Sequence, residues 1–126
     1  MGIINSAYGK FFSAYPWNYF ATIRPHYNLT TYGSQNMMKR LVKAEGVERV
    51  FFTLEQDFNP SGIHAHLLIE TKRKLNIRKV AELLKTKPIT ISYFQKIESI
   101  EDTVFYTTKY IGMNVLHYDY FERDQF

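Results

Sequence analysis

Residues 50–70 read VFFTLEQDFNPSGIHAHLLIE and decide the fold of this chain. Two runs rich in β-branched and aromatic residues lie on either side of the turn-forming segment Asn59-Pro60-Ser61. Such a pattern predicts two strands joined by a short connection, a β-hairpin. Side chains on a strand alternate between its two faces, so His64 and His66 are expected to project from the same face.

The hairpin also predicts a third ligand beside the two histidines. If Asp57 lies opposite Gly62, with four residues between them in the loop, then Glu55 lies opposite His64. Cross-strand partners share a face at about 5 Å between Cβ atoms, so Glu55, His64 and His66 are expected to converge. Two imidazoles and one carboxylate leave coordination positions open for substrate and could hold Mg²⁺ or Mn²⁺. Asp57 is a rival carboxylate on the same face, one step nearer the turn.

The histidine pair has a plainer interpretation. Two histidines on one strand face are often half-exposed side chains that bind nothing, and the matching position of Glu55 is what favours a metal site. His26 and His117 have no comparable neighbours, and we predict them to be surface or loop histidines.

Further elements flank the hairpin in sequence. Periodicity and capping residues predict, in order, a strand at 19–24, a helix capped by Thr30 or Thr31 and running to about Ala44, hairpin strands at 50–57 and from Gly62, a helix capped by Asn76 and ending before Pro88, a strand at 89–97, and a last helix from Ser99 to near Gly112. This order, β-α-β-β-α-β with an appended helix, predicts an α+β fold with a ferredoxin-like antiparallel sheet and helices packed on it. Residues 8–15 or 115–121 could add an edge strand.

Composition is consistent with a small enzyme or binding module. The 126 residues, net charge +4, predict a single domain spanning 1–126, and without cysteine there are no disulfides or thiolate metal sites. No apolar run approaches the roughly 18 residues of a membrane span, and the start lacks signal-peptide features, so a cytoplasmic location without membrane association is expected. Ten Tyr and ten Phe accompany the positive charge. Aromatic faces stack unpaired bases and cations attract phosphates, although most of these rings are expected to fill the core.

The last predicted helix has a distinct polar face. Side chains spaced i, i+3, i+4 and i+7 share that face, namely Tyr106, Lys109, Tyr110 and Met113. A phenol has an ordinary pKa of about 10, so it becomes a nucleophile at neutral pH only with help from a nearby ammonium or a metal-bound phosphate. Alternatively, the tyrosine belongs to the core and the lysine only extends past it into solvent.

Together these elements resemble the HUH superfamily of single-strand DNA endonucleases, and within it the rolling-circle replication initiators, or Rep proteins. Phe20-Ala21-Thr22-Ile23 looks like the first family motif and His64-Ala65-His66 the second, with Glu55 at the position of the family's acidic ligand. Tyr106-Thr107-Thr108-Lys109 is similar to the third, Tyr-x-x-Lys. The resemblance covers about residues 17 to 113.

The resemblance implies nicking and joining of DNA by transesterification at a replication origin. Tyr106 would attack the scissile phosphate of unpaired DNA, giving a 5′-phosphotyrosine link and a free 3′-OH, while Glu55, His64 and His66 hold the divalent ion. Lys109 would neutralise nearby charge. Some relatives carry a second reactive tyrosine followed by its own lysine, but here that lysine position is Met113. Tyr106 is therefore expected to be the main nucleophile, with Tyr110 auxiliary or structural.

Partners follow from the same resemblance. Single-stranded DNA at an origin is the expected substrate, and the candidate phosphate contacts are Arg24, Lys39, Arg40, Lys72, Arg73 and Lys74. The sequence has no Walker-type nucleotide-binding motif, so either a host helicase unwinds the duplex or the chain is a nickase domain of a longer protein. A host polymerase is expected to extend the 3′-OH. Both a monomer and a dimer are compatible with the sequence.

Two other functions share many of these features. An HUH transposase of the insertion-sequence type also has a His-x-His pair and a helical tyrosine, but it transfers strands between element ends. A non-catalytic module that binds single-stranded nucleic acid would use the same aromatic residues for stacking and would form no covalent adduct with DNA.

Overall fold

The computed structural model describes residues 13–25, 29–57, 62–108 and 115–123. The described chain forms one five-stranded sheet in the order β4-β1-β3-β2-β5, in which every neighbouring pair is antiparallel. Its strands are β1 (Tyr19–Ile23), β2 (Val47–Gln56), β3 (Ile63–Thr71), β4 (Ile91–Lys96) and β5 (Val115–Glu122). The predicted α+β, ferredoxin-like sheet is confirmed, with β5 as an added edge strand.

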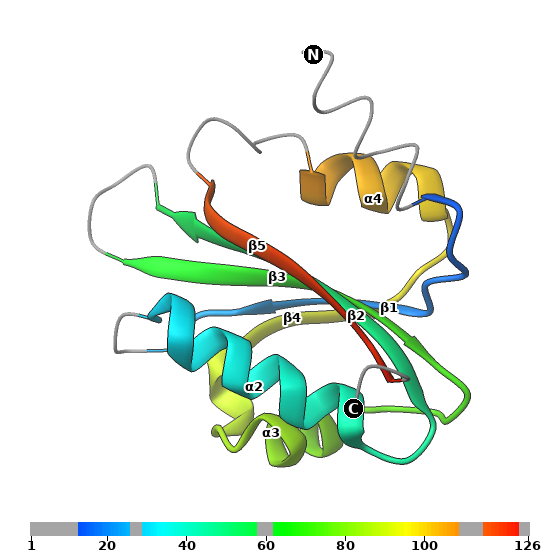
Figure 1. Cartoon of the computed structure of the whole chain (residues 1–126), viewed down its shortest axis with the longest axis horizontal. Coiled ribbons are helices and arrows are strands. Elements are labelled where there is room, and N and C mark those ends of the chain that lie inside the picture. The colour runs from blue at the N-terminus through cyan, green and yellow to red at the C-terminus, as the bar shows by residue number, and fades with distance from the viewer. Residues whose placement is uncertain (1–12, 26–28, 58–61, 109–114, 124–126) are drawn as a thin grey trace.

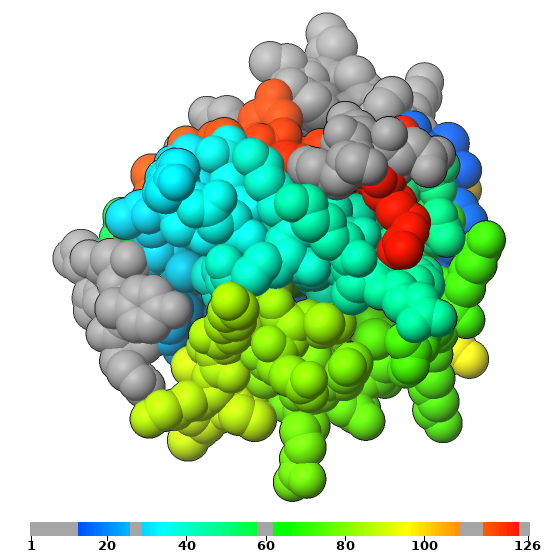
Figure 2. Space-filling view, turned by 60° about the horizontal axis from the view of Figure 1, so that its bottom comes forward, coloured from blue at the N-terminus to red at the C-terminus, as the bar shows by residue number. Residues whose placement is uncertain are grey.

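Helices cover both faces of the sheet (Figure 1). The first face carries α2 (Thr31–Lys43) and α3 (Ile77–Leu84), which together form the continuous surface seen in Figure 2. The opposite face lies beneath α4 (Ile100–Thr108). We call this second surface the α4 face. It is the face that carries the candidate site.

Alternation along the strands divides the core between these two faces. The larger cluster, under α2 and α3, includes Ile23, Phe52, Leu67 and Leu84, all fully buried. The smaller cluster lies under α4 and consists of Trp17, Phe20, Phe51, Leu68 and Val104. The α4 face therefore has apolar support near the middle of the sheet, which leaves its ends for polar side chains.

The helix starts follow the predicted capping chemistry. Thr30 Oγ1 accepts a hydrogen bond from Gly33 N–H at 2.9 Å, and Asn76 Oδ1 accepts one from Lys79 N–H at 2.8 Å. Ser99 Oγ accepts from Asp102 N–H at 3.3 Å at the start of α4. The predicted end of this helix near Gly112 lies outside the described residues.

The starts of two strands differ from the predictions, and the structure shows which segment forms the edge strand. β4 begins at Ile91, not residue 89, because Pro88 starts a short 3₁₀ turn that runs to Thr90. β2 begins at Val47, three residues earlier than expected. Of the two possible edge strands, residues 115–121 form β5 beside β2, whereas residues 8–12 of the other lie outside the described residues.

Candidate functional site

The hairpin of β2 and β3 has the predicted register. Glu55 pairs with His64, and the Asp57 N–H donates to the Gly62 carbonyl at 3.0 Å. Because pairing partners share a face, Glu55, His64 and His66 all project from the α4 face of the sheet.

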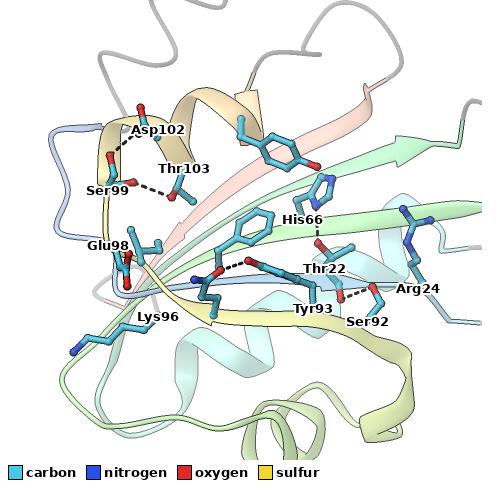
Figure 3. A pocket seen from close by; sticks show the side chains of 14 residues that line it. Thr22, Arg24, His66, Ser92, Tyr93, Lys96, Glu98, Ser99, Asp102 and Thr103 are labelled. Atoms are coloured by element: carbon cyan, nitrogen blue, oxygen red, sulfur yellow. Dashed lines mark hydrogen bonds between the residues drawn. The ribbon is translucent and has the colours of Figure 1, made fainter.

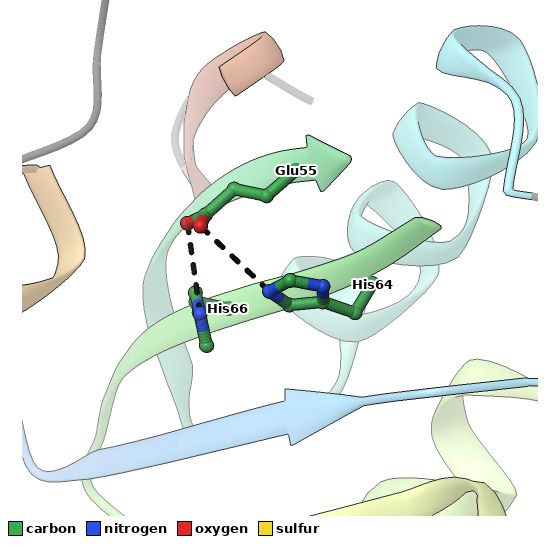
Figure 4. Close-up of side chains that lie close together, drawn as sticks. All are labelled: Glu55, His64 and His66. Carbon is green, nitrogen blue, oxygen red and sulfur yellow. Dashed lines mark ion pairs between the residues drawn. The ribbon is translucent and has the colours of Figure 1, made fainter. Parts of the chain in front are cut away.

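The three side chains converge, as Figure 4 shows. Glu55 Oε1 lies 3.7 Å from His64 Nε2, and Glu55 Oε2 lies 3.6 Å from His66 Nε2. One donor atom from each residue lies within 4.8 Å of the other two, and the residues are only 3%, 7% and 6% exposed. Ligands of one divalent ion at about 2.1 Å can be up to about 4 Å apart. The cluster can therefore accept such an ion with small side-chain movements.

Hydrogen bonds at the other ring nitrogens fix how the imidazoles face. His64 Nδ1 lies 2.5 Å from Asp57 Oδ1, and His66 Nδ1 lies 2.9 Å from Thr22 Oγ1. An ionised carboxylate only accepts hydrogen bonds, so Asp57 engages Nδ1 of His64 as the donor and leaves Nε2, which faces Glu55, as the ring atom available to a cation. Partners of this kind orient metal-binding histidines. Asp57, the rival ligand in the sequence prediction, thus contacts the outer nitrogen of His64.

The carboxylate at the centre of the cluster favours its ionised form. Burial alone would raise the pKa of Glu55, but its interactions with His64, His66 and Thr53 outweigh that effect, so the pKa lies below its usual value. The Thr53 hydroxyl donates to Glu55 Oε2 at 2.9 Å. The site therefore presents an anionic oxygen beside two imidazole nitrogens, which is a suitable donor set for a divalent cation.

Tyr106 lies next to this cluster on α4. Its ring centroid is 5.6 Å from that of His66 and 5.9 Å from that of Phe20, both edge to face. Val104, two residues earlier, is fully buried and anchors the helix, whereas Tyr106 is 47% exposed. The ring thus lies at the surface beside His66 and not in the core. Lys109, Tyr110 and Met113 lie outside the described residues.

Of the predicted phosphate contacts, Arg24 lies at the site. Its Nη1 donates to Asp57 Oδ1 at 3.1 Å, and the side chain is half exposed. Lys39 and Arg40 belong to α2, on the other face of the sheet. Lys72, Arg73 and Lys74 follow the end of β3 that lies opposite to His64, where Lys72 pairs with Glu48 and Arg73 with Glu45. The structure therefore groups one of these six cations with the cluster.

A cavity of about 560 Å³ opens beside the cluster, between β1, β4 and α4 (Figure 3). Phe20, Thr22, His66 and Tyr106 line the cavity, and His66 is also a member of the Glu55, His64 and His66 cluster. The sequence interpretation missed the cavity's other prominent residues, namely Tyr93, Gln95, Lys96 and Glu98. The alternation of Tyr93 and Gln95 on β4 was visible in the sequence, but the β1–β4 pairing that brings them to the site was not.

His117 differs from its prediction. It lies in β5 and not in a loop, and it is partly buried, with its ring 5.9 Å from that of Phe52 on the face opposite to the candidate site. His26 lies outside the described residues.

Comparisons of the chain with protein-family models, with curated proteins and with solved structures found no match. Among the described residues, no helix has the length and apolar character that crossing a membrane requires.

Proposed function

We propose that this chain is a metal-dependent endonuclease and strand transferase for single-stranded DNA, acting as a rolling-circle replication initiator of the HUH type. One observation carries the proposal: two Nε2 atoms and a buried carboxylate converge beside a half-exposed tyrosine on a neighbouring helix. Phosphoryl transfer to tyrosine requires a phenol close to a bound cation. Here the Tyr106 ring contacts the ring of His66, one of the three residues of the cluster.

Glu55, His64 and His66 would hold the divalent ion, Mg²⁺ or Mn²⁺. When bound, the ion supplies positive charge that stabilises the phosphate in the transition state. Arg24, at the edge of the site, would add a further contact to the DNA backbone. Lys109 follows Tyr106 by three residues in the sequence. It would neutralise charge near the phosphate.

Tyr106 would carry out the bond exchange. Its Oη forms a bond to phosphorus while the bond from phosphorus to the 3′ oxygen breaks, so the phenol loses its proton and the departing 3′ oxygen gains one. The products are a 5′-phosphotyrosine link and a free 3′-OH, and attack by a 3′-OH reverses the step and rejoins the strand. We expect the reaction to occur in the cytoplasm, where a host helicase and polymerase supply unwinding and extension.

The test is formation of a covalent adduct. Single-stranded oligonucleotides of randomised sequence, labelled at the 3′ end that stays on the protein, are incubated with the protein and Mn²⁺ and then separated on a denaturing gel. Wild-type protein is expected to retain label, and both Tyr106→Phe and a chelator are expected to abolish it. Tyr120→Phe is the matched control, because Tyr120 is also on the α4 face but bonds to Arg49 and Glu122.

The other outcomes separate the alternatives. If Tyr106→Phe still forms the adduct and Tyr110→Phe does not, the nucleophile is Tyr110 and not Tyr106. Strand exchange between two hairpin ends would favour the transposase. Binding without any adduct would favour the non-catalytic module, which the exposed rings of Tyr93 and Phe105 also support.

A further inference from the structure

The cavity beside the metal cluster has aromatic walls. Phe20 is almost buried, and its ring lies 5.7 Å from Tyr93 and 5.9 Å from Tyr106, edge to face in both cases. Tyr93 and Tyr106 are 48% and 47% exposed. Large rings that remain half exposed around a concave surface are typical of binding sites. At about 560 Å³, the cavity falls within the range of small-molecule pockets.

Its two ends differ in charge (Figure 3). Arg24 lies at the end nearest His66, whereas Glu98 and Asp102 lie at the far end, from which Lys96 also extends. A phosphate is favoured near Arg24 and disfavoured near the two carboxylates. A ligand with a phosphate at one end and a hydrogen-bond donor at the other would match this arrangement.

The polar groups between these ends are held in place. The Tyr93 hydroxyl donates to the Gln95 side-chain carbonyl. Tyr93 pairs with Thr22 and Gln95 with Phe20 across the β1–β4 ladder, so all four side chains share the α4 face. A flat ring entering the cavity would therefore meet a positioned aromatic face on β4.

We propose that this cavity binds one unpaired nucleobase bearing an exocyclic amino group, next to the scissile phosphate, and so selects the nicking sequence. This inference rests on the proposed function for the identity of the ligand as single-stranded DNA. The base stacks on Tyr93, its phosphate stays at the Arg24 end, and its amino group donates to Glu98 or Asp102. Carboxylates only accept hydrogen bonds, so they discriminate against a base that presents a carbonyl oxygen at that position.

The test is binding without catalysis. Fluorescence anisotropy is measured in a chelator with two dT oligonucleotides that carry either dC or dU at the centre, because these bases differ at the amino-bearing position. Wild-type protein is expected to bind the dC oligonucleotide about fivefold or more tightly. Replacing Glu98→Gln together with Asp102→Asn should bring the ratio close to one. Glu101→Gln, the same kind of change next to Asp102 on α4 but not among the cavity residues, should preserve it.

Stacking is tested separately. Tyr93→Ala is expected to weaken binding of both oligonucleotides by roughly 5- to 150-fold, whereas Tyr93→Phe retains a ring and should stay near wild type. Tyr32→Ala, at a more exposed tyrosine on α2, is the control. Equal binding of dC and dU by wild-type protein, or unchanged binding by a folded Tyr93→Ala protein, would overturn the proposal. These binding measurements involve no cleavage. Base discrimination can therefore be absent while the adduct forms, and it can be present while no adduct forms.

Discussion

The same strands carry two polar clusters on the α4 face, one at each end, and the clusters differ in how their charge is balanced. At one end, Arg49 pairs with Glu70 across β3 and with Glu122 across β5. Its guanidinium lies 2.6 Å from Glu70 and 3.4 Å from Glu122, and the ring of Tyr15 covers it at 4.6 Å. Six residues further along β2, Glu55 faces His64 and His66.

The difference is the source of the positive charge. The Arg49 end contains a permanent cation: burial alone would lower the pKa of Arg49, but Glu70 and Tyr120 raise it above its usual value. The Glu55 end offers a carboxylate and two imidazole nitrogens, which are cation ligands. We infer that the first cluster holds strands together and that the second one is built to receive a cation from solution.

The largest expected effect comes from removing an imidazole at the Glu55 end. His66→Ala should reduce adduct formation by at least about 100-fold, the scale of losing one group that stabilises transition-state charge. Affinity for single-stranded DNA should change little, because most phosphate and base contacts do not involve the ion. Gel assays of the adduct and anisotropy of binding check both. Arg49→Met should still form the adduct. If this variant lost the adduct as well, the two clusters would not differ in function as inferred.

The next effect concerns the hydrogen bonds behind the imidazoles. Asp57→Asn should weaken cation binding by roughly 10- to 100-fold, as for other outer partners of metal-bound histidines. Thr22→Val should weaken cation binding less. His66 is hydrogen-bonded to the neutral hydroxyl of Thr22, whereas His64 is hydrogen-bonded to the carboxylate of Asp57, which is the stronger partner. Calorimetric titration with Mn²⁺ measures both. Equal affinity in Asp57→Asn and wild type would show that Asp57 does not orient His64.

At the Arg49 end, the expected effect is on stability. Arg49→Met should lower the free energy of unfolding by about 1–2 kcal/mol, because Glu70 is largely buried and loses its charged partner. Cation affinity should stay unchanged. Urea denaturation followed by circular dichroism gives the first quantity. A decrease in cation affinity in this variant would mean that the two clusters are coupled through β2.

The smallest effect is a pH dependence at the same end. The bond from the Tyr120 hydroxyl and the charge and bond from Arg49 keep the pKa of Glu122 below its usual value, against a weaker effect of burial. The unfolded chain therefore takes up the proton first as pH falls, so the contribution is complete above about pH 5 and is lost as pH falls below about 4.3. Because Glu122 is partly exposed, the change should be under about 1 kcal/mol. Unfolding curves of wild type and Glu122→Gln between pH 3 and 6 should converge at the acid end.

Local sequence was sufficient to predict the centre of the site. Placing Asp57 opposite Gly62 was enough to give the observed register of β2 and β3, and that register places Glu55 opposite His64. The caps at Thr30, Asn76 and Ser99 were likewise readable, since each depends on a hydrogen bond three residues away.

The rest depends on contacts between distant segments. Arg24 meets Asp57, and Tyr93 meets Thr22, only because β1 pairs with both β3 and β4. Charge alone did not say which face a cation occupies, so Lys39 and Arg40 were considered together with Arg24. The 3₁₀ turn Pro88–Thr90 replaces the expected start of β4 at residue 89, because the fixed φ of proline suits the first position of a helical turn.

The most direct test of the cation site compares two carboxylates on neighbouring strands. Mn²⁺ binding is measured by calorimetry and by electron paramagnetic resonance for wild type, Glu55→Gln and Glu70→Gln. We predict one ion per chain in wild type and in Glu70→Gln, and at least a 100-fold weaker site in Glu55→Gln, which keeps the side-chain shape but removes the anionic ligand. Undiminished binding in a folded Glu55→Gln protein would contradict the account.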